Sequence, residues 1–456
     1  MKKLNIVILA AGKGERMLSK KPKVMHEIMG RPMIGYVVER AKELSPARIV
    51  VVVGYGREKV EAYLKGYNID YSIQTKQKGT AHALLTAIEF IKDGDVLVLY
   101  GDVPLIESAT LKNFLKFYEK IKGITFMTTD VENPIGYGRV VMEKDEILKI
   151  IEEADATPEE RKIKRINTGI CIIPRQSFNL LKAIKPDNKK GEYYLIDICS
   201  IAKRKGLSVK GYHYQKASEV LGINTRKELL EANITMKDRI LDKHMQDGVT
   251  LLDRNIFIEA NVKIGRDTII SPNCHLIGNT IIGENVTIGP NTIIKDTKIH
   301  GGVNIEGFVV IDGAEIKEGT RIGPFSQIRP ATFIGKGVEI GNFVEIKNSV
   351  IQDKAKANHL SYIGDAEIGR QVNIGAGTIT CNYDGKKKHK TIIEDNVFVG
   401  SNTELIAPIR IGKDAVIGAG STITKDVPDG ALAISRTRQK HVKGYGRKKG
   451  VRNSRI

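Results

Sequence analysis

The stretch IGENVTIGPNTII at Ile282–Ile294 carries the pattern that decides the fold, because an aliphatic residue returns at every sixth position. The rhythm covers the chain in three phased runs: Ile264, Ile270, Leu276, Ile282, Ile288 and Ile294; Ile322, Ile328, Ile334, Ile340 and Ile346; Ile393, Val399, Leu405, Ile411, Ile417 and Ile423. A period of six is neither helical nor a simple alternation. It predicts a parallel β-helix of hexapeptide repeats, in which each aliphatic residue points into a narrow prism.

Glycine often follows the aliphatic position, for example at Gly283, Gly289 and Gly335. A backbone that turns a corner there has no room for a Cβ, which favours glycine. A glycine-rich β-sandwich would instead show alternating residues and hairpin turns.

At 456 residues the chain is too long for one ordinary domain, so we expect two or three. Apolar stretches such as Ile49–Val53 are far shorter than a membrane span, and no membrane partner is expected. The start, MKKLNIVILAAG, leads into a glycine-rich loop rather than a cleavage site, so we interpret it as a first strand. The four cysteines show no paired spacing that would indicate a disulfide framework or a zinc site, and we expect a cytoplasmic protein.

The net charge of +19 has three explanations that the sequence leaves open. A nucleic-acid partner is the least favoured, because no recognised nucleic-acid motif is present. Phosphorylated small molecules would also be held by Lys and Arg, and a solvated basic surface would account for much of the excess. The tail from Arg436 to Arg455 is especially basic.

The first part of the chain alternates strand-like and helix-like segments, which predicts an α/β domain with a mostly parallel sheet over residues 1–226. We expect strands at Asn5–Leu9, Arg48–Val53 and Asp95–Tyr100, and helices at Ile34–Leu44 and Thr80–Ile91. Residues 227–247 have helix-favouring composition and are expected to form a linker helix. The repeat domain would then occupy residues 248–456, with coils up to about Asp429 and a basic tail.

Two stretches of the first domain suggest a ligand site. LAAGKGERM at Leu9–Met17 follows the first strand, where glycines would let backbone N–H groups approach a phosphate and Lys13, Arg16 and Lys23 would add charge. An ordinary strand–helix turn explains this loop equally well. LYGDVP at Leu99–Pro104 places Asp102 at the carboxyl end of a strand, where open α/β sheets bind ligands. One such carboxylate, together with one distant oxygen ligand and substrate phosphates, suffices for Mg²⁺.

The six-residue rhythm lapses after Ile346 and again at Cys381–Lys390. Insertions in a solenoid form surface loops, frequently on the binding face, so we expect both lapses to be loops. His359 lies in the first of them. A neutral imidazole can accept a proton near cellular pH, which makes His359 a candidate general base, although a lone histidine is more often a surface or core residue.

Motifs in both halves together resemble one family. In the first half they are LAAGKGERM, Lys23-Val24, Gln74 with Gln77–Thr80, LYGDVP, GYGR (Gly136–Arg139), Glu152 and INTG (Ile166–Gly169). In the second half they are RPATFIG (Arg329–Gly335), GNFVEIKNS (Gly341–Ser349), HLSYIGDAEIG (His359–Gly369), NIGAGTITCNYDG (Asn373–Gly385) and ALAISR (Ala431–Arg436). The chain resembles the bifunctional N-acetylglucosamine-1-phosphate uridyltransferase/glucosamine-1-phosphate acetyltransferase family over its whole length. The resemblance implies a Rossmann-like nucleotidyltransferase domain, a left-handed β-helix and a homotrimer.

For the first half, the resemblance implies UTP and Mg²⁺ as partners in the synthesis of UDP-N-acetylglucosamine. Asp102 and Asn224 would bind Mg²⁺, and Gln74 would read the uracil edge. The full set implied to bind UTP or UDP-N-acetylglucosamine is Leu9, Ala10, Ala11, Gly12, Arg16, Lys23, Gln74, Gly79, Thr80, Tyr100, Gly101, Asp102, Gly138, Glu152, Asn167 and Asn224.

For the second half, the resemblance implies acetyl transfer from acetyl-CoA to glucosamine-1-phosphate, with His359 as the base that deprotonates the amine. The sugar phosphate would be bound by Arg329, Lys347, Tyr362, Asn373, Asn382 and Tyr383, and acetyl-CoA by Ala376, Ser401, Ala419 and Arg436. Lys386–Lys388 would contact the phosphates of coenzyme A or form a solvated loop.

Two other functions remain as alternatives. One is a monofunctional sugar-1-phosphate nucleotidyltransferase whose β-helix only assembles or regulates, and His359, Arg329 and Lys347 argue against it. The other is a regulatory scaffold that binds nucleotide sugars without turnover, and Lys23 with Asp102 argues against that.

Overall fold

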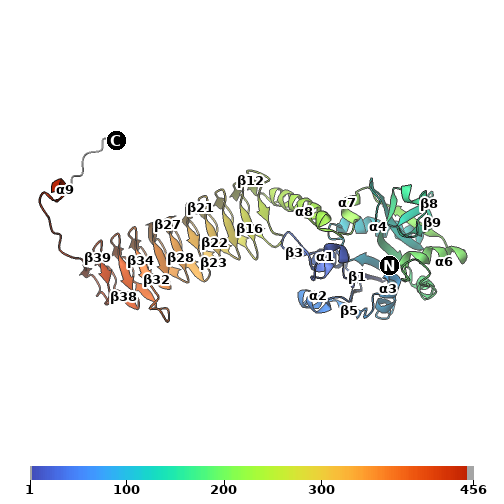
Figure 1. Cartoon of the computed structure of the whole chain (residues 1–456), viewed down its shortest axis with the longest axis horizontal. Helices are drawn as coiled ribbons and strands as arrows, with labels where there is room; N and C mark the ends of the chain where they lie inside the picture. Colours follow the sequence, from blue (N-terminus) through green and yellow to red (C-terminus); the bar gives the residue numbers. More distant parts are fainter. Residues whose placement is uncertain (1–2, 449–456) are drawn as a thin grey trace. The chain divides into compact units, whose positions relative to one another are not determined.

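The computed structural model describes residues 3–448 and divides the chain into two compact units, Met1–Lys237 and Asp238–Ile456 (Figure 1). The segment expected as a linker coincides with helix α8 (Arg226–Gln246), and the division falls inside this helix. Its first part belongs to the first unit, where Asn233 accepts a hydrogen bond from the backbone N–H of Met29 at 3.0 Å. Its last part belongs to the second unit, where Leu241 joins the core. No helix of the described residues combines the length and the apolar composition that a membrane crossing requires.

Within the described residues, the first unit is built on a nine-stranded sheet in the order β5-β4-β1-β6-β10-β7-β11-β9-β8. The strands are β1 (Leu4–Leu9), β4 (Arg48–Val53), β5 (Asp70–Ile73), β6 (Asp95–Tyr100), β7 (Ile124–Asp130), β8 (Arg139–Glu143), β9 (Glu146–Ile151), β10 (Arg165–Ile173) and β11 (Val209–His213). The pairings make β9 and β10 antiparallel to the rest. The half formed by β5, β4, β1 and β6 is purely parallel.

Helices cover both faces of this sheet, which explains the continuous apolar strands. Val7 and Leu9 of β1 belong to one core, and Ile6 and Ile8 belong to the other. The first core also takes residues of α3 (Thr80–Ile88), α5 (Phe178–Leu181) and α6 (Ile198–Arg204). The second takes residues of α1 (Met33–Lys42), α2 (Arg57–Tyr63) and α4 (Ser108–Ile121). The strands and helices expected from the sequence all form, and no end differs by more than three residues.

The second unit is a three-sided stack of short parallel strands (Figure 1). In the described part of the chain its faces contain 11, 10 and 9 strands. They run from β12 (Thr250–Leu251) to β41 (Leu432–Ala433), from β13 (Phe257–Ile258) to β40 (Thr422–Ile423) and from β14 (Lys263–Ile264) to β38 (Ile409–Ile411). Sixteen of the aliphatic residues of the three runs are buried, and Ile264 packs partly buried against the same core. The six-residue rhythm is therefore confirmed as the inward row of the prism.

The lapses in the rhythm have two different causes. Ile282 pairs with Ile299 and Ile299 with Ile316, so a coil can contain 17 residues instead of 18 by losing one residue at a corner. The same shortening follows Ile346, and no loop forms there. The expectation that His359 lies in an interrupting loop is wrong: His359 ends strand β30 (Lys356–His359) and pairs with Asn342. The small inward residue Ala357 hid this strand in the sequence.

The second lapse is a true insertion. Thr380 of β34 (Ile379–Cys381) pairs with Leu405 of β37 (Glu404–Ile406), which gives this coil 25 residues. The extra residues lie between Cys381 and Lys390, and a bridge between Tyr383 and Lys388 closes the loop on itself. The expected surface loop is confirmed here.

Candidate functional site

The glycine-rich loop and the LYGDVP stretch meet at one edge of the sheet. Leu9 lies between Val52 and Tyr100 in register, so β1, β4 and β6 end together. Beyond the strands, Ala10 donates to the carbonyl of Val52 and Gly101 donates to the carbonyl of Leu9, both at 2.9 Å. Leu9, Ala10 and Ala11 are buried, whereas Gly12 is exposed and has open space where a Cβ would lie. Backbone at this edge is thus presented to a ligand at Gly12.

Four polar side chains converge beside this loop. The Lys23 ammonium group forms an ion pair with the Asp102 carboxylate and donates to Asn224 Oδ1 at 2.8 Å. Arg16 Nη2 donates to the same Asn224 oxygen at 2.8 Å. The Lys23 and Asp102 side chains are only 15% and 13% exposed, so the ion pair is largely shielded from water. The chain brings these residues together from positions up to 208 apart.

The Asp102–Asn224 pair offers two hard oxygens to one cation, which in this structure is the Lys23 ammonium group. Mg²⁺ prefers such oxygens and takes few of them from protein when phosphates supply the rest. Gly222 lies beside this carboxylate, and a Cβ there would be in van der Waals contact with both Asp102 oxygens at 3.4 Å. Among the described residues there is no cluster of three or more His, Cys, Asp or Glu side chains that could form an all-protein metal cage. The donor set fits a magnesium ion that shares its coordination with substrate.

Gln74, Gly79, Thr80 and Tyr100 line a second part of the same edge. Gln74 follows β5, is buried and donates to the carbonyl of Gly79 at 3.1 Å. Thr80 Oγ1 accepts from the backbone N–H of Leu195 at 2.9 Å, and its side chain also bonds Tyr100. Burial raises the pKa of Tyr100, so the phenol stays neutral. The Tyr100 ring packs on Gly169, where a Cβ would lie 2.6 Å from a ring carbon.

Gly138, Glu152 and Asn167 lie close to one another at the ends of β8, β9 and β10. Asn167 donates its backbone N–H to the carbonyl of Gly138 at 2.8 Å. A Cβ on Gly138 would lie 3.5 Å from Glu152 Oε1, so glycine leaves this carboxylate accessible. Burial, and then the Asp155 and Asp197 carboxylates, raise the pKa of Glu152, while Lys190 opposes them. A group that presents several hydroxyl donors, such as a sugar, would satisfy this carboxylate.

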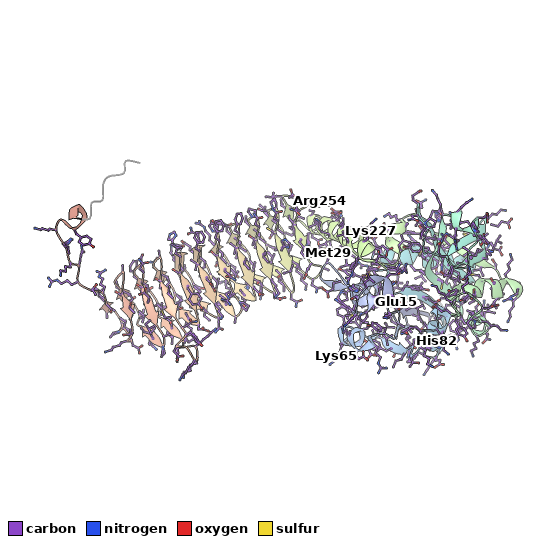
Figure 2. The ribbon with its side chains drawn as sticks, in the orientation of Figure 1. Glu15, Met29, Lys65, His82, Lys227 and Arg254 are labelled. Carbon is purple, nitrogen blue, oxygen red and sulfur yellow. The ribbon has the colours of Figure 1, made fainter. Side chains whose placement is uncertain are left out.

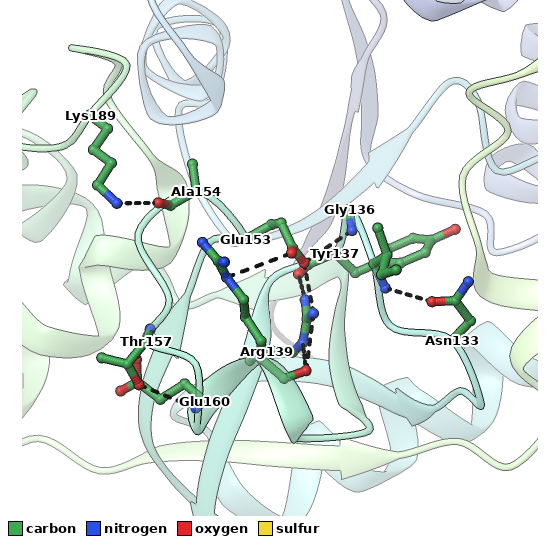
Figure 3. A network of polar contacts seen from close by, with 11 residues as sticks. Asn133, Gly136, Tyr137, Arg139, Glu153, Ala154, Thr157, Glu160 and Lys189 are labelled. Atoms are coloured by element: carbon green, nitrogen blue, oxygen red, sulfur yellow. Dashed lines mark hydrogen bonds and ion pairs between the residues drawn. The ribbon is translucent and has the colours of Figure 1, made fainter.

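Arg139 belongs to the GYGR motif but was not predicted as a site residue (Figure 3). Its side chain is only 1% exposed and pairs with Glu153 at 2.7 Å. It also donates to the carbonyls of Tyr137 and Arg161. Glu153 in turn accepts from the backbone N–H of Gly136 at 3.1 Å. Arg139 therefore ties the Gly136–Gly138 turn to the segment that carries Glu152.

In the second unit, the candidate base and the candidate acetyl-CoA residues form one column. His359, Ala376, Ser401 and Ala419 each follow by two positions an inward residue of the first face, and these inward residues pair in register from Ala357 through Ile374 and Val399 to Ile417. Arg436 reaches this column by donating to the carbonyl of Ala419 at 2.7 Å. His359 Nδ1 contacts Asn342 Oδ1 at 3.0 Å, one coil earlier. His359 is exposed and borders a cavity of about 370 Å³ together with Arg321, Asn342 and Asn358.

The candidate phosphate ligands lie at the next corner instead. Arg329 and Lys347 stand one coil apart at the ends of β25 (Gln327–Ile328) and β28 (Glu345–Lys347). The Lys388 side chain of the inserted loop, with Arg329, lowers the pKa of Lys347. Arg329, Lys347 and Lys388 thus gather three cationic groups at one corner, which fits a phosphate. Arg329 Nη1 is meanwhile held by Glu345 at 2.7 Å.

Two further candidates complete the corner at Lys347, a third lies in the inserted loop, and the fourth lies on another face. Asn382 donates to Asp365 and, at 3.4 Å, to the Tyr362 hydroxyl. Tyr383 is exposed within the inserted loop. Asn373, by contrast, begins β33 (Asn373–Ile374) on the first face, paired with Lys356.

The second face separates the His359 column from the Lys347 corner, so one chain does not gather its candidate acetyltransferase residues at one point. A cavity of about 800 Å³ between α3 and Arg175 is lined by none of these candidate residues.

Comparison with known proteins covers both units. The family model of the MobA-like NTP transferase domain matches residues 6–169. Bacterial transferase hexapeptide repeats match residues 261–296, and hexapeptide repeats of succinyl-transferase match 390–425. With the stacked parallel strands, these matches confirm a Rossmann-like nucleotidyltransferase domain and a left-handed parallel β-helix of hexapeptide repeats.

Curated relatives match over nearly the full chain. The "Bifunctional protein GlmU" of Thermodesulfovibrio yellowstonii is 48% identical over 98% of this chain and 99% of its own length. The proteins of the same name from Caldanaerobacter subterraneus and Bordetella parapertussis are 47% and 42% identical, over 98% and 97% of this chain and 98% and 99% of theirs. A solved structure of UDP-glucose pyrophosphorylase complexed with UDP-glucose has a TM-score of 0.45 and 23% identity, and covers 52% of this chain and 100% of that chain.

Proposed function

The chain belongs to the family of bifunctional GlmU proteins, and we propose from this that its two units catalyse two successive steps of UDP-N-acetylglucosamine synthesis. The second unit transfers an acetyl group from acetyl-CoA to glucosamine-1-phosphate. The first unit then transfers UMP from UTP to the resulting N-acetylglucosamine-1-phosphate. The observation that carries this proposal is the 48% identity over 98% of the chain, which includes both units. A monofunctional nucleotidyltransferase is not favoured.

In the uridylyl transfer, a phosphate oxygen of the sugar phosphate attacks the α-phosphorus of UTP and pyrophosphate leaves. The attacking oxygen is already a nucleophile, so the protein has to orient the reactants and stabilise charge. We assign Leu9–Gly12, Gln74, Gly79 and Thr80 to the nucleotide, with Tyr100 and Gly101 behind them. Arg16 and Lys23 lie where they can neutralise phosphate charge. We assign Gly138, Glu152, Asn167 and Asn224 to the sugar.

We propose Mg²⁺ as the metal of this unit, held by Asp102 and Asn224. Their oxygens converge on the Lys23 ammonium group, which supports a cation at this point. When bound, the ion neutralises phosphate charge that develops during transfer.

In the acetyl transfer, the amine of glucosamine-1-phosphate attacks the thioester carbonyl and the thiolate of coenzyme A leaves. We propose that His359 takes the proton of the attacking amine. The Nδ1 atom of the ring already contacts Asn342 Oδ1, which leaves Nε2 to accept the proton of the substrate. Arg329, Lys347, Tyr362, Asn382 and Tyr383 would bind the sugar phosphate. Acetyl-CoA would bind along Ala376, Ser401, Ala419 and Arg436, and Asn373 would contact a substrate from the first face.

We propose that the protein is a homotrimer and that each acetyltransferase site is completed by a neighbouring chain. The separation of the His359 column from the Lys347 corner supports this, because one chain holds only part of the site. An exposed apolar row beside His359 supports it as well. The rings of Phe308, Phe325 and Phe343 stack at 5.0 and 5.4 Å between centroids, remain about half exposed, and are continued by Leu360. Burial of such a row against another copy would be favourable.

We propose the cytoplasm as the compartment. All four cysteines lie within the described residues and are unpaired, as is usual in a reducing environment.

A coupled assay tests both activities. The purified chain receives glucosamine-1-phosphate, acetyl-CoA, UTP and Mg²⁺, and each component is omitted in turn. We expect free thiol to appear without UTP, and pyrophosphate to appear only when acetyl-CoA, or N-acetylglucosamine-1-phosphate in its place, is present with Mg²⁺. Pyrophosphate release with no thiol release in any mixture would support the monofunctional alternative.

A further inference from the structure

The orientation of the Gln74 amide is fixed by its surroundings. The amide atom that lies 3.1 Å from the carbonyl oxygen of Gly79 must be the nitrogen, because a carbonyl oxygen only accepts hydrogen bonds. Gly79 cannot move away easily. It adopts φ 108°, and a Cβ there would lie 2.5 Å from the backbone oxygen of Tyr193. The acceptor that holds Gln74 Nε2 is therefore part of a rigid backbone corner.

The second proton of this amide nitrogen points to a histidine. His82, on α3 and labelled in Figure 2, places Nδ1 3.0 Å from Gln74 Nε2. The amide nitrogen can only donate, so Nδ1 must accept, and the imidazole is neutral with its proton on Nε2. Burial, and then the Lys78 charge, lower the pKa of His82, which agrees with a neutral ring.

These two contacts use both protons of the Gln74 amide and leave its oxygen. Within residues 3–448 no hydrogen bond reaches Gln74 Oε1, although the side chain is only 4% exposed. The oxygen of this largely buried residue is therefore available to accept a hydrogen bond from a ligand. The Gln74 side chain thus offers a hydrogen-bond acceptor, Oε1, and no free donor.

We propose that His82 is the positioning residue that sets the base specificity of the uridylyl transfer, by holding Gln74 with its oxygen toward the base. This rests on the proposed function, in which Gln74 contacts the pyrimidine. Uracil carries an N–H donor at ring position 3, whereas cytosine carries an acceptor there. Gln74 Oε1 accepts from the first and repels the second. Without His82, only the Gly79 carbonyl would hold the amide nitrogen, so a rotated amide that presents its NH₂ group to cytosine would cost less free energy.

The test compares UTP with CTP in the full-length protein with N-acetylglucosamine-1-phosphate. The variants are His82→Leu, which fills the space but cannot accept, and His82→Asn, whose amide oxygen can accept from Gln74. We expect the ratio of kcat/KM for UTP to that for CTP to fall about 10-fold in His82→Leu, the usual effect of one misplaced hydrogen bond. In His82→Asn the ratio should stay close to that of the unaltered protein.

Three outcomes decide between the readings. An unchanged ratio in His82→Leu overturns the proposal, and so does an equal loss for both nucleotides, which indicates a purely structural role. Absence of UTP turnover in the unaltered protein refutes the proposed function itself. If His82→Leu does not fold, the tautomer of His82 in the unaltered protein can be measured by ¹⁵N NMR, with assignment from His82→Asn. A ring protonated at Nδ1 at neutral pH contradicts the proposal, and a proton on Nε2 alone supports it.

Discussion

The two units assemble their candidate sites in opposite ways. In the first unit, Lys23, Asp102 and Asn224 come from distant parts of the chain and meet at one ammonium group. In the second, His359, Ala376, Ser401 and Ala419 repeat the same place on successive coils and never meet Lys347.

The difference follows from topology. Parallel strands of an α/β sheet end at a common edge, so the loops after them gather distant residues. A solenoid places residues by their period, so equivalent positions form rows and different corners stay apart. The first fold can complete a pocket within one chain, whereas we propose that the second completes one by apposition with another chain.

Loss of His359, the proposed general base, is expected to have the largest effect among the changes that test this comparison. His359→Ala should lower acetyl transfer by about 10²–10⁴-fold, because the amine would lose its proton acceptor. Uridylyl transfer from added N-acetylglucosamine-1-phosphate should stay unchanged. Thiol release from acetyl-CoA and pyrophosphate release measure the two activities separately. Near-normal acetyl transfer in this variant would remove His359 from the chemistry.

The reciprocal change removes the Asp102 carboxylate, which pairs with the Lys23 ammonium group in the first unit. Asp102→Ala should lower uridylyl transfer by about 10²–10³-fold, since one charge-stabilising group is lost from the site. Acetyl transfer should persist. Asp145→Ala, which removes an exposed turn carboxylate paired with Lys210, serves as the matched control. A pyrophosphate release rate equal to that of the control would contradict the assignment.

Mixing two inactive variants tests whether the second site needs two chains. Co-expressed His359→Ala and Lys347→Ala subunits should recover about a quarter of the normal acetyl transfer. In a random cyclic assembly, one interface in four joins an intact histidine to an intact lysine. Each variant alone should stay near its own residual rate. Absence of recovery would place the complete site within a single chain.

Substitution of Glu152 is expected to have opposite effects on the stability and on the activity of the first unit. Its pKa is raised by burial, so its contribution to stability is present below the unfolded pKa and is lost as pH rises through the folded value. Glu152→Gln should therefore stabilise the protein at neutral pH and raise the KM for the sugar phosphate about 10-fold. Thermal melts and initial rates measure the two effects, with the exposed residue change Glu143→Gln as control. A lower melting temperature at neutral pH would argue that the carboxylate is well paired.

The smallest effect is expected on the outer surface of the β-helix. Lys317, and then His300, lower the pKa of Glu315 to about 2. Stability from this group is present above its unfolded pKa of about 4.5 and is lost as pH falls toward 2. Glu315→Gln should cost less than about 1 kcal/mol at neutral pH, because water screens this partly exposed pair. Urea denaturation followed by circular dichroism should find this difference shrinking below pH 4. A constant difference would exclude the charge as its cause.

Local patterns in the sequence predicted most of the fold. The inward rows of the prism and the strands around Leu9 and Tyr100 could be read directly, because burial on a fixed period leaves a composition signal. Strand β30 could not, since Ala357 is too small to mark an inward position. The roles of Arg139 and His82 were also missed. Arg139 donates to backbone carbonyls, and His82 contacts the Gln74 side chain. No spacing in the sequence indicates such contacts, because they form only in the folded chain.

The pairing pattern of the β-helix implies that its resistance to opening is graded along its length. Each rung bonds only to the rung before and after it, and in the described chain β41 has a neighbour on one side alone. In such a stack the terminal strands have the lowest local stability, so opening is expected to begin at the last coil. Arg436 crosses back to Ala419 at this end. A coenzyme bound to both Arg436 and Ala419 would stabilise this end of the β-helix. Hydrogen exchange of the backbone amides of Leu432–Ala433 should therefore slow as acetyl-CoA is added.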